Sequence, residues 1–221
     1  MSDNSFFREV DQELRQDQAK ALWERYGLLM IGVAVAVVVA TVAWVSWEYW
    51  TQSRANASGD AYLNALSLAT EGQTEEAQAA LAELESGGYG AYPVLARMRG
   101  ATLQAEAGNH AEAVAAFDSV AADRAVPVSI QDMARLRAAL LLVDHGSYQD
   151  VATRVEALAV ETSPLRHSAR EALAVAAWKD GRLSDAQTLF TQILDDDGAP
   201  QNLRRRAEMM SELIRGSDTA S

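Results

Sequence analysis

The chain has 221 residues and a formal net charge of −12 at pH 7, and it contains no cysteine. The absence of cysteine excludes disulfide bonds, thiol catalysis and cysteine-ligated zinc sites. The excess of acidic residues argues against nucleic acid as a partner, because phosphate binding needs a basic face. Only four prolines occur and alanine is abundant, so we expect a helical protein with few strands.

Residues 1–26 form a polar segment that we expect to be a weakly amphipathic helix in the cytoplasm. Apolar residues recur in it at helical spacing, but Asp17 and Gln18 interrupt the apolar face. Two interpretations remain open: a solvated helix beside the membrane, and a helix that docks onto a cytoplasmic partner or the lipid surface. A helix on a lipid surface would carry more Lys and Arg than this one.

Residues 27–47 contain no charged side chain. As a helix they would span roughly 30 Å, which is the thickness of the hydrocarbon core of a bilayer. Aromatic residues flank the segment on both sides, where they would anchor a helix at the two membrane interfaces. These anchors are Trp23, Tyr26, Trp44, Trp47, Tyr49 and Trp50. A buried core helix and a cleaved signal peptide are the alternatives. The length of the segment and the polar segment of 26 residues before it favour a retained anchor.

Basic residues indicate the orientation of this transmembrane helix. Four of them precede it, whereas only Arg54 lies in the 20 residues after Trp47. The positive-inside rule therefore places the N-terminus in the cytoplasm. We expect a single-pass protein of the bacterial inner membrane with its C-terminal domain in the periplasm.

A stripe of small residues lies within the span. Gly32, Ala36 and Ala40 recur every four residues, which places them on one face of a helix. Small residues at this spacing allow two membrane helices to pack closely. The stripe predicts a contact with another membrane helix, although alanine and valine make up most of the span.

The rest of the chain contains a repeat. After residues 48–57, which we expect to be a linker or an extension of the helix, residues 58–215 hold four segments that align on a glycine at spacings of 36, 38 and 35 residues. The residues that define the repeat are Gly72, Ala77, Gly108, Ala113, Gly146, Val151, Gly181 and Ala186. Alanine occupies the position seven residues before each glycine: Ala65, Ala101, Ala139 and Ala174. A larger residue stands nine after it: Leu81, Phe117, Val155 and Phe190.

This pattern predicts stacked helical hairpins. Each glycine would end the first helix in the left-handed conformation, and the small residues would let two antiparallel helices approach closely. The larger residue would fill the gap to the next hairpin, since one hairpin cannot bury its apolar face alone. We expect helices over 55–71, 74–86, 92–107, 110–122, 129–145, 148–161, 165–180 and 183–195, and a capping helix over 200–214. Residues 216–221 would be a disordered tail.

No residue pattern indicates an enzyme, a cofactor or a metal site. The three histidines lie in different hairpins without a shared ligand spacing, and we expect His110 and His145 to be exposed near turns. Three consecutive aspartates, 195–197, lack the spacing of a calcium loop and are expected to be a solvated helix end. The arginines at 204–206 are expected to balance them.

The matched positions, over residues 61–196, resemble the tetratricopeptide repeat. The large aromatic residue that usually stands early in the first helix is not evident, and the repeats are slightly long. The fold class is therefore all-α: one N-terminal transmembrane helix, followed by a tetratricopeptide-like α-solenoid of about four helical hairpins with a C-terminal capping helix.

The whole chain also resembles the YfgM-type ancillary subunits of the Sec translocon. The stretches that carry this resemblance are WVSWEYW at 44–50, SGDAYLNAL at 58–66 and YGAYPVLARMRGATLQAEAGN at 89–109. The N-terminal segment is longer than in the best-known members. The resemblance implies a non-enzymatic scaffold that binds the translocon, a membrane-anchored periplasmic chaperone of the prolyl-isomerase type and unfolded exported proteins. The residues alone indicate a tethered binding scaffold, and an adaptor of another cell-envelope complex, anchored or released by cleavage, is the alternative.

Overall fold

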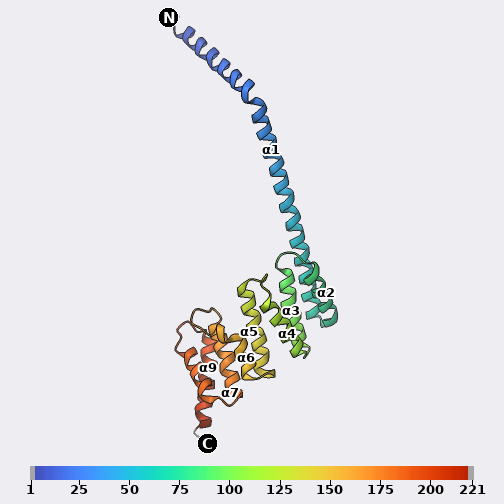
Figure 1. Ribbon diagram of the computed structural model, residues 1–221, viewed down its shortest axis with the longest axis vertical. Coiled ribbons are helices and arrows are strands. Elements are labelled where there is room, and N and C mark those ends of the chain that lie inside the picture. Colours follow the sequence, from blue (N-terminus) through green and yellow to red (C-terminus); the bar gives the residue numbers. More distant parts are fainter. Residues whose placement is uncertain (1–2, 219–221) are drawn as a thin grey trace. The chain divides into compact units, whose positions relative to one another are not determined.

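The computed structural model describes the backbone of residues 3–218 and the side chains of residues 20 and 23–216. Over residues 3–218 the chain is helical and forms no strand (Figure 1), which confirms the all-α fold. The helices are α1 (Asp3–Thr70), α2 (Thr74–Gly87), α3 (Tyr92–Glu106), α4 (His110–Ala122), α5 (Val128–His145), α6 (Tyr148–Val155), the 3₁₀ helix η1 (Glu156–Leu158), α7 (Arg166–Lys179), α8 (Leu183–Leu194) and α9 (Gln201–Asp218). Two compact units, residues 1–56 and 57–221, divide the chain and are described separately.

The first unit consists of the N-terminal part of α1. The backbone is helical without a break through residues 48–57, so this segment extends the helix. The hydroxyl of Thr41 donates to the carbonyl oxygen of Val37 at 2.8 Å, which satisfies a polar group inside the apolar segment. The apolar face expected at the start of the chain lies outside the described side chains.

The second unit is a stack of antiparallel helix pairs. The last part of α1 pairs with α2, α3 with α4, α5 with α6, and α7 with α8, while α9 packs against α8 and α7. Each pair also contacts the first helix of the next pair. This is the solenoid of four hairpins and a capping helix that the repeat predicts.

Three of the four repeat glycines adopt the left-handed conformation. The φ angles are 80° at Gly72, 86° at Gly108 and 77° at Gly181, and in each case the glycine follows the first helix of a hairpin. A residue with a Cβ atom is strained at such an angle, whereas glycine is not. Glycine therefore lets the chain reverse direction within a short turn.

Gly146 corrects the expectation for the third hairpin. Its φ is −135° and its ψ is −173°, which is extended backbone that other residues also adopt. A Cβ at this position would lie 2.7 Å from Cδ2 and 3.2 Å from Cβ of Leu142, so a larger residue would have to displace the Leu142 side chain. The next residue, Ser147, starts α6 by accepting a hydrogen bond from the backbone N–H of Asp150 at 3.2 Å.

The core is divided into four clusters that follow the repeat. Each cluster combines the two helices of one hairpin with the first helix or segment that follows. Phe117 of α4, for example, packs with Ala101 of α3 and Ala134 of α5. The alanines before the glycines and the larger residues after them are at most 2% exposed. Hydrophobic burial between neighbouring hairpins thus holds the solenoid together.

Two helix ends differ from the sequence expectation. The helix expected over 148–161 ends at Val155, and η1 follows it. After η1, the carbonyl oxygen of Ala159 accepts a hydrogen bond from Arg170 of α7 at 2.9 Å. The backbone N–H of Ser163 donates to the carbonyl oxygen of Val160 at 3.0 Å, so the α-helical bonding pattern does not continue. At the other end of the chain, α9 continues to Asp218, because the buried Ile214 holds its last turns. The start of the expected disordered tail, 216–218, is therefore helical, and residues 219–221 lie outside the described residues.

Candidate functional site

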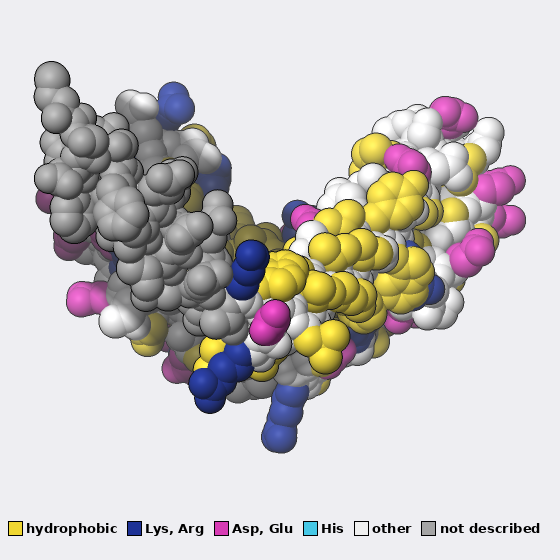
Figure 2. All heavy atoms as spheres, turned by 90° about the horizontal axis from the view of Figure 1, so that it is seen from above, with side chains coloured by type: hydrophobic (Ala, Val, Ile, Leu, Met, Phe, Trp, Pro, Cys, Tyr) yellow, Lys and Arg dark blue, Asp and Glu magenta, His cyan; other side chains and the backbone are white. Residues whose placement is uncertain are grey.

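The apolar part of α1 exposes its side chains. Within the described residues, one helix is long and apolar enough to cross a membrane, judged by length and composition. Its valines are between 55% and 62% exposed, and Figure 2 shows hydrophobic side chains gathered as a yellow band. Exposed apolar surface on this scale marks a site that contacts lipid or protein.

The expected interfacial anchors are also exposed. The exposed fractions of their side chains run from 43% at Tyr26 to 77% at Tyr49. The ring centroids of Trp47 and Trp50 lie 5.6 Å apart, and the guanidinium of Arg54 lies 4.9 Å from the Trp50 ring. A cation beside an aromatic ring at the end of an apolar helix is typical of a membrane interface.

The small residues Gly32, Ala36 and Ala40 lie on one exposed face of α1. A Cβ added at Gly32 would meet no atom within 4 Å, so no described residue packs against this face there. Every other face of residues 28–50 is exposed as well, so a contact of this stripe with a partner helix stays a prediction.

The residues that define the repeat have a structural role. Ala77, Ala113, Val151 and Ala186 are all 0% exposed. None of them is accessible to a partner, so binding surfaces on the solenoid must come from other positions of the same helices.

Of the two histidines expected to be exposed, His145 is exposed and His110 is half-buried. The rings of His110 and His145 stack with their centroids 3.6 Å apart and their planes 13° apart, although the two residues belong to different hairpins. The sequence missed this contact because it arises where the start of α4 meets the end of α5. His167 is buried and lies 2.9 Å from a carboxylate oxygen of Asp196. Among the described residues, no group of three His, Asp or Glu side chains is arranged to hold a metal ion.

Asp196 is the centre of an ionic cluster that joins the start of α7 to the loop before α9. Its carboxylate accepts a hydrogen bond from Arg166 Nε at 2.7 Å and from the backbone N–H of Gly198 at 2.9 Å. Arg170 Nη1 lies 3.6 Å away. These contacts hold the pKa of Asp196 well below its usual range, with the hydrogen bond from Arg166 as the largest cause. The cluster holds the loop before α9 against the start of α7, and its charges are paired with one another.

The arginines near the aspartates partly balance them. Arg204 Nη2 donates to the carbonyl oxygen of Asp196 at 2.7 Å and lies 3.5 Å from the Asp197 carboxylate. Arg206 instead reaches Glu171 of α7, with Nη2 donating to Oε2 at 2.8 Å. The first contact is the expected local balance, whereas the second ties the capping helix to the last hairpin.

A groove runs along the first helices of three consecutive hairpins. It has a volume of about 280 Å³, and it is called the first-helix groove below. It is lined by Tyr62 of α1, Leu95, Met98, Arg99 and Thr102 of α3, and Ile130, Met133 and Arg137 of α5. The lining residues of α3 and α5 recur at spacings of three, four and seven, so each helix presents one face to the groove.

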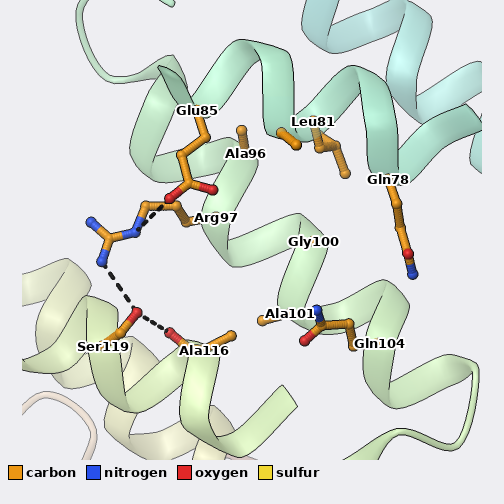
Figure 3. A pocket seen from close by; sticks show the side chains of 11 residues that line it. Gln78, Leu81, Glu85, Ala96, Arg97, Gly100, Ala101, Gln104, Ala116 and Ser119 are labelled. Carbon is orange, nitrogen blue, oxygen red and sulfur yellow. Dashed lines mark hydrogen bonds and ion pairs between the residues drawn. The ribbon is translucent and has the colours of Figure 1, made fainter. Parts of the chain in front are cut away.

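A second cleft lies between α2 and α4 over α3, on the side of the second helices (Figure 3). Its volume is about 300 Å³. Gly100 and small neighbours form its floor, and a Cβ added at Gly100 would meet no atom within 4 Å. Arg97 at one end is paired with Glu85 at 3.7 Å and with Asp123 at 2.7 Å. The residues that line the two clefts were not identified from the sequence, because they come from helices far apart in the chain.

Stacked helical hairpins with an exposed groove along their first helices define a helical-repeat protein that binds other proteins. The chain belongs to the tetratricopeptide repeat-like domain family, whose model matches residues 20–209. Domains of this class are protein-interaction scaffolds and are typically non-catalytic. Neither the comparison with curated proteins nor the comparison with solved structures found a match.

Proposed function

We propose that this protein is a non-enzymatic, membrane-anchored interaction scaffold and an ancillary subunit of the Sec translocon, linking protein export to periplasmic chaperones. The observation that carries the proposal is the combination, within one family match over residues 20–209, of an exposed apolar helix with a helical-repeat unit. A tether and a binding domain on one chain keep partners at the membrane and raise their local concentration.

The charge distribution supports the orientation of the anchor. Lys20 and Arg25 precede the apolar segment, and Arg54 is the one basic residue in the 20 residues after Trp47. Basic residues flank the cytoplasmic end of a membrane helix more often than the other end. In this orientation, the N-terminus is cytoplasmic and the helical repeats are in the periplasm.

The link to the translocon rests on the resemblance of three stretches to the YfgM-type subunits. Two of these stretches, 58–66 and 89–109, meet in the structure. The backbone N–H of Tyr89 donates to Ser58 Oγ at 2.9 Å, and the ring centroids of Tyr62 and Tyr92 lie 6.1 Å apart. A Cβ at Gly59 would lie 2.9 Å from the hydroxyl of Tyr92, so a larger residue here would displace the Tyr92 ring. Local packing therefore gives the similar residues a shared structural role.

The experiment that tests the function is purification of the full-length protein from native membranes in a mild detergent, with identification of the proteins that co-purify. We expect translocon subunits together with a periplasmic chaperone. The consistent recovery of a different envelope complex, without the translocon, would reject the translocon role and favour an adaptor of that complex.

The anchor is tested separately by the size of the mature protein and its resistance to extraction with alkaline carbonate. We expect a full-length chain that stays in the membrane pellet and retains Trp44 and Trp50. A shorter, soluble mature chain that begins after Trp50 would show that the segment is cleaved.

A further inference from the structure

We propose that the first-helix groove binds an apolar polypeptide segment that carries carboxylates next to its apolar residues. This inference rests on the scaffold part of the proposed function and names the chemistry of the partner. It does not depend on which membrane complex the protein joins.

The walls of the groove are apolar and adaptable. Leu95 and Met133 are each 37% exposed, and Tyr62, Met98 and Ile130 are half-buried around them. Methionine is unbranched and polarizable, so a surface that contains two methionines can fit apolar side chains of different shapes. These walls suit a partner that offers Leu, Phe or Met side chains, in more than one sequence.

The groove also carries positive charge that the protein does not neutralise. Arg137 is exposed and forms no ion pair or side-chain hydrogen bond with any described residue. Arg99 reaches Glu106 through Nη1 at 3.2 Å, but its Nε is buried and has no hydrogen-bond partner within the described part of the chain. The buried Nε of Arg99 offers no accessible surface, so Arg137 is the residue whose charge a partner's carboxylate can reach.

The surrounding charge makes this groove unusual. From Thr51 to the end of the chain, 24 acidic residues outnumber 15 basic ones, yet the lining of the groove contains two arginines and no acid. The second-helix cleft differs, because its Arg97 is already paired with Glu85 and Asp123. The cleft beside Asp196 is lined by four acids against two arginines, and both of those arginines face Asp196. Of these three clefts, the first-helix groove alone presents unneutralised arginine to a partner, and complementarity favours an acidic one.

The groove is small, which suits single side chains of a longer bound segment. Its volume of about 280 Å³ lies just below the range of typical small-molecule pockets, which is roughly 300–1,000 Å³. A volume of this size holds one or two side chains. The exposed Leu140, one turn after Arg137 on the same face of α5, offers further contact of the kind that a longer bound segment would need.

The test uses the purified full-length protein in detergent and a short fluorescent peptide in which Leu and Glu alternate. Fluorescence anisotropy would report binding of this peptide and of matched peptides in which Gln or Lys replaces Glu. We expect the Glu peptide to bind most tightly. Its affinity should fall as salt is added, because salt screens exposed charge pairs.

Arg137→Glu is the informative variant, because Arg137 is exposed and unpaired and its replacement leaves the fold intact. We expect this variant to bind the Glu peptide about tenfold more weakly and the Lys peptide more tightly, since it reverses one charge at the groove. Arg124→Glu is the matched control: it makes the same change of charge at an exposed residue of the loop between α4 and α5. It should leave the binding of both peptides within about twofold of the wild-type protein.

A second pair of variants tests the apolar wall. Met133→Asp should abolish binding of the Glu peptide, whereas Met209→Asp, at an exposed methionine of α9, should not. Equal affinity for the Glu and Lys peptides, or equal effects of Arg137→Glu and Arg124→Glu, would overturn the inference. Either result would leave co-purification with the translocon unaffected, so failure of this inference is distinguishable from failure of the proposed function.

Discussion

Arg154 of α6 and Asp118 of α4 are 36 residues apart, which is one repeat, and their side chains form a two-bond contact between neighbouring hairpins. Nε donates to one carboxylate oxygen at 3.0 Å and Nη2 to the other at 2.6 Å. Contacts of similar span join Lys179 to Asp144 and Arg206 to Glu171, each 35 residues apart. Ion pairs between neighbouring repeats, together with the apolar core, thus determine how the hairpins align.

The Arg154–Asp118 contact should contribute measurably to stability. A double-mutant cycle with Arg154→Ala and Asp118→Ala should give a coupling free energy of about 0.5–1 kcal/mol, since the pair is bidentate but partly exposed. Urea unfolding of the four proteins would measure it. The exposed pair Arg182 and Asp185, at the start of α8, is the control and should show a smaller coupling. A coupling of zero for the first pair would show that it has no role in hairpin alignment.

Substitution of Gly108 and of Gly146 should destabilise the protein for different physical reasons. At Gly108, where φ is 86°, alanine should destabilise the protein by about 1–2 kcal/mol and asparagine by less, because asparagine tolerates the left-handed conformation. At Gly146 the cause is contact with Leu142, so asparagine should be no better than alanine. Thermal unfolding of the four single variants would measure this. An advantage for asparagine at both positions would contradict the difference in backbone conformation.

Much of this solenoid could be predicted from the sequence because its repeat lies in local spacing. In each repeat, the residue nine positions after the glycine lies on the second helix, where that helix meets the next hairpin. Phe117 and Phe190 occupy this position and are buried. Gly146 was the exception. Glycine serves two physical needs, a positive φ or free space, and only the backbone conformation and the neighbouring side chains distinguish them.

The individual residues that line the groove could not be predicted in the same way. Tyr62, Met98 and Met133 are 36 and 35 residues apart, and each alone looks like one apolar residue of an amphipathic helix. Whether such a residue faces the core or a groove depends on the rotation of each helix, which packing sets. The stack of His110 on His145 escaped prediction for the same reason, because it joins the ends of two antiparallel helices.

Gly100 should tolerate and even favour a side chain. It lies inside α3, and an added Cβ meets no atom within 4 Å. Gly100→Ala should therefore stabilise the protein by about 0.5–1 kcal/mol through helix propensity, and it should leave peptide binding at the first-helix groove unchanged. Denaturant unfolding together with the anisotropy assay would check both. A loss of a co-purifying partner in this variant would instead reveal that the second-helix cleft is an interface.

Asp196 should make the stability of the repeat unit depend on pH. Its pKa in the folded protein lies below the value of about 3.9 for an unfolded chain, so its contribution is fully present above that pH. The contribution is lost as the pH falls below about 4 and the carboxylate takes up a proton. Asp196→Asn should therefore lower the melting temperature at neutral pH, and the difference from the wild-type protein should shrink in acid. Asp180→Asn, at an exposed aspartate outside any described ion pair, is the control, and an equal pH dependence in both variants would reject the role of Asp196.

The face of α1 that carries Gly32, Ala36 and Ala40 is the place to test how the anchor meets its membrane partner. Ala36→Leu enlarges this face in the middle of the span, whereas Ala34→Leu makes the same change two residues away, on the opposite side of the helix. Both variants stay apolar, so both should insert in the membrane. If close helix packing holds the complex together, Ala36→Leu should reduce the yield of co-purified partners severalfold and Ala34→Leu should not, because a larger side chain separates the two backbones. Quantitative mass spectrometry of the purified complexes would measure the yields. Equal yields from the two variants would mean that the anchor holds the protein in the bilayer without docking on a partner helix, and that the helical repeats alone bind the partners.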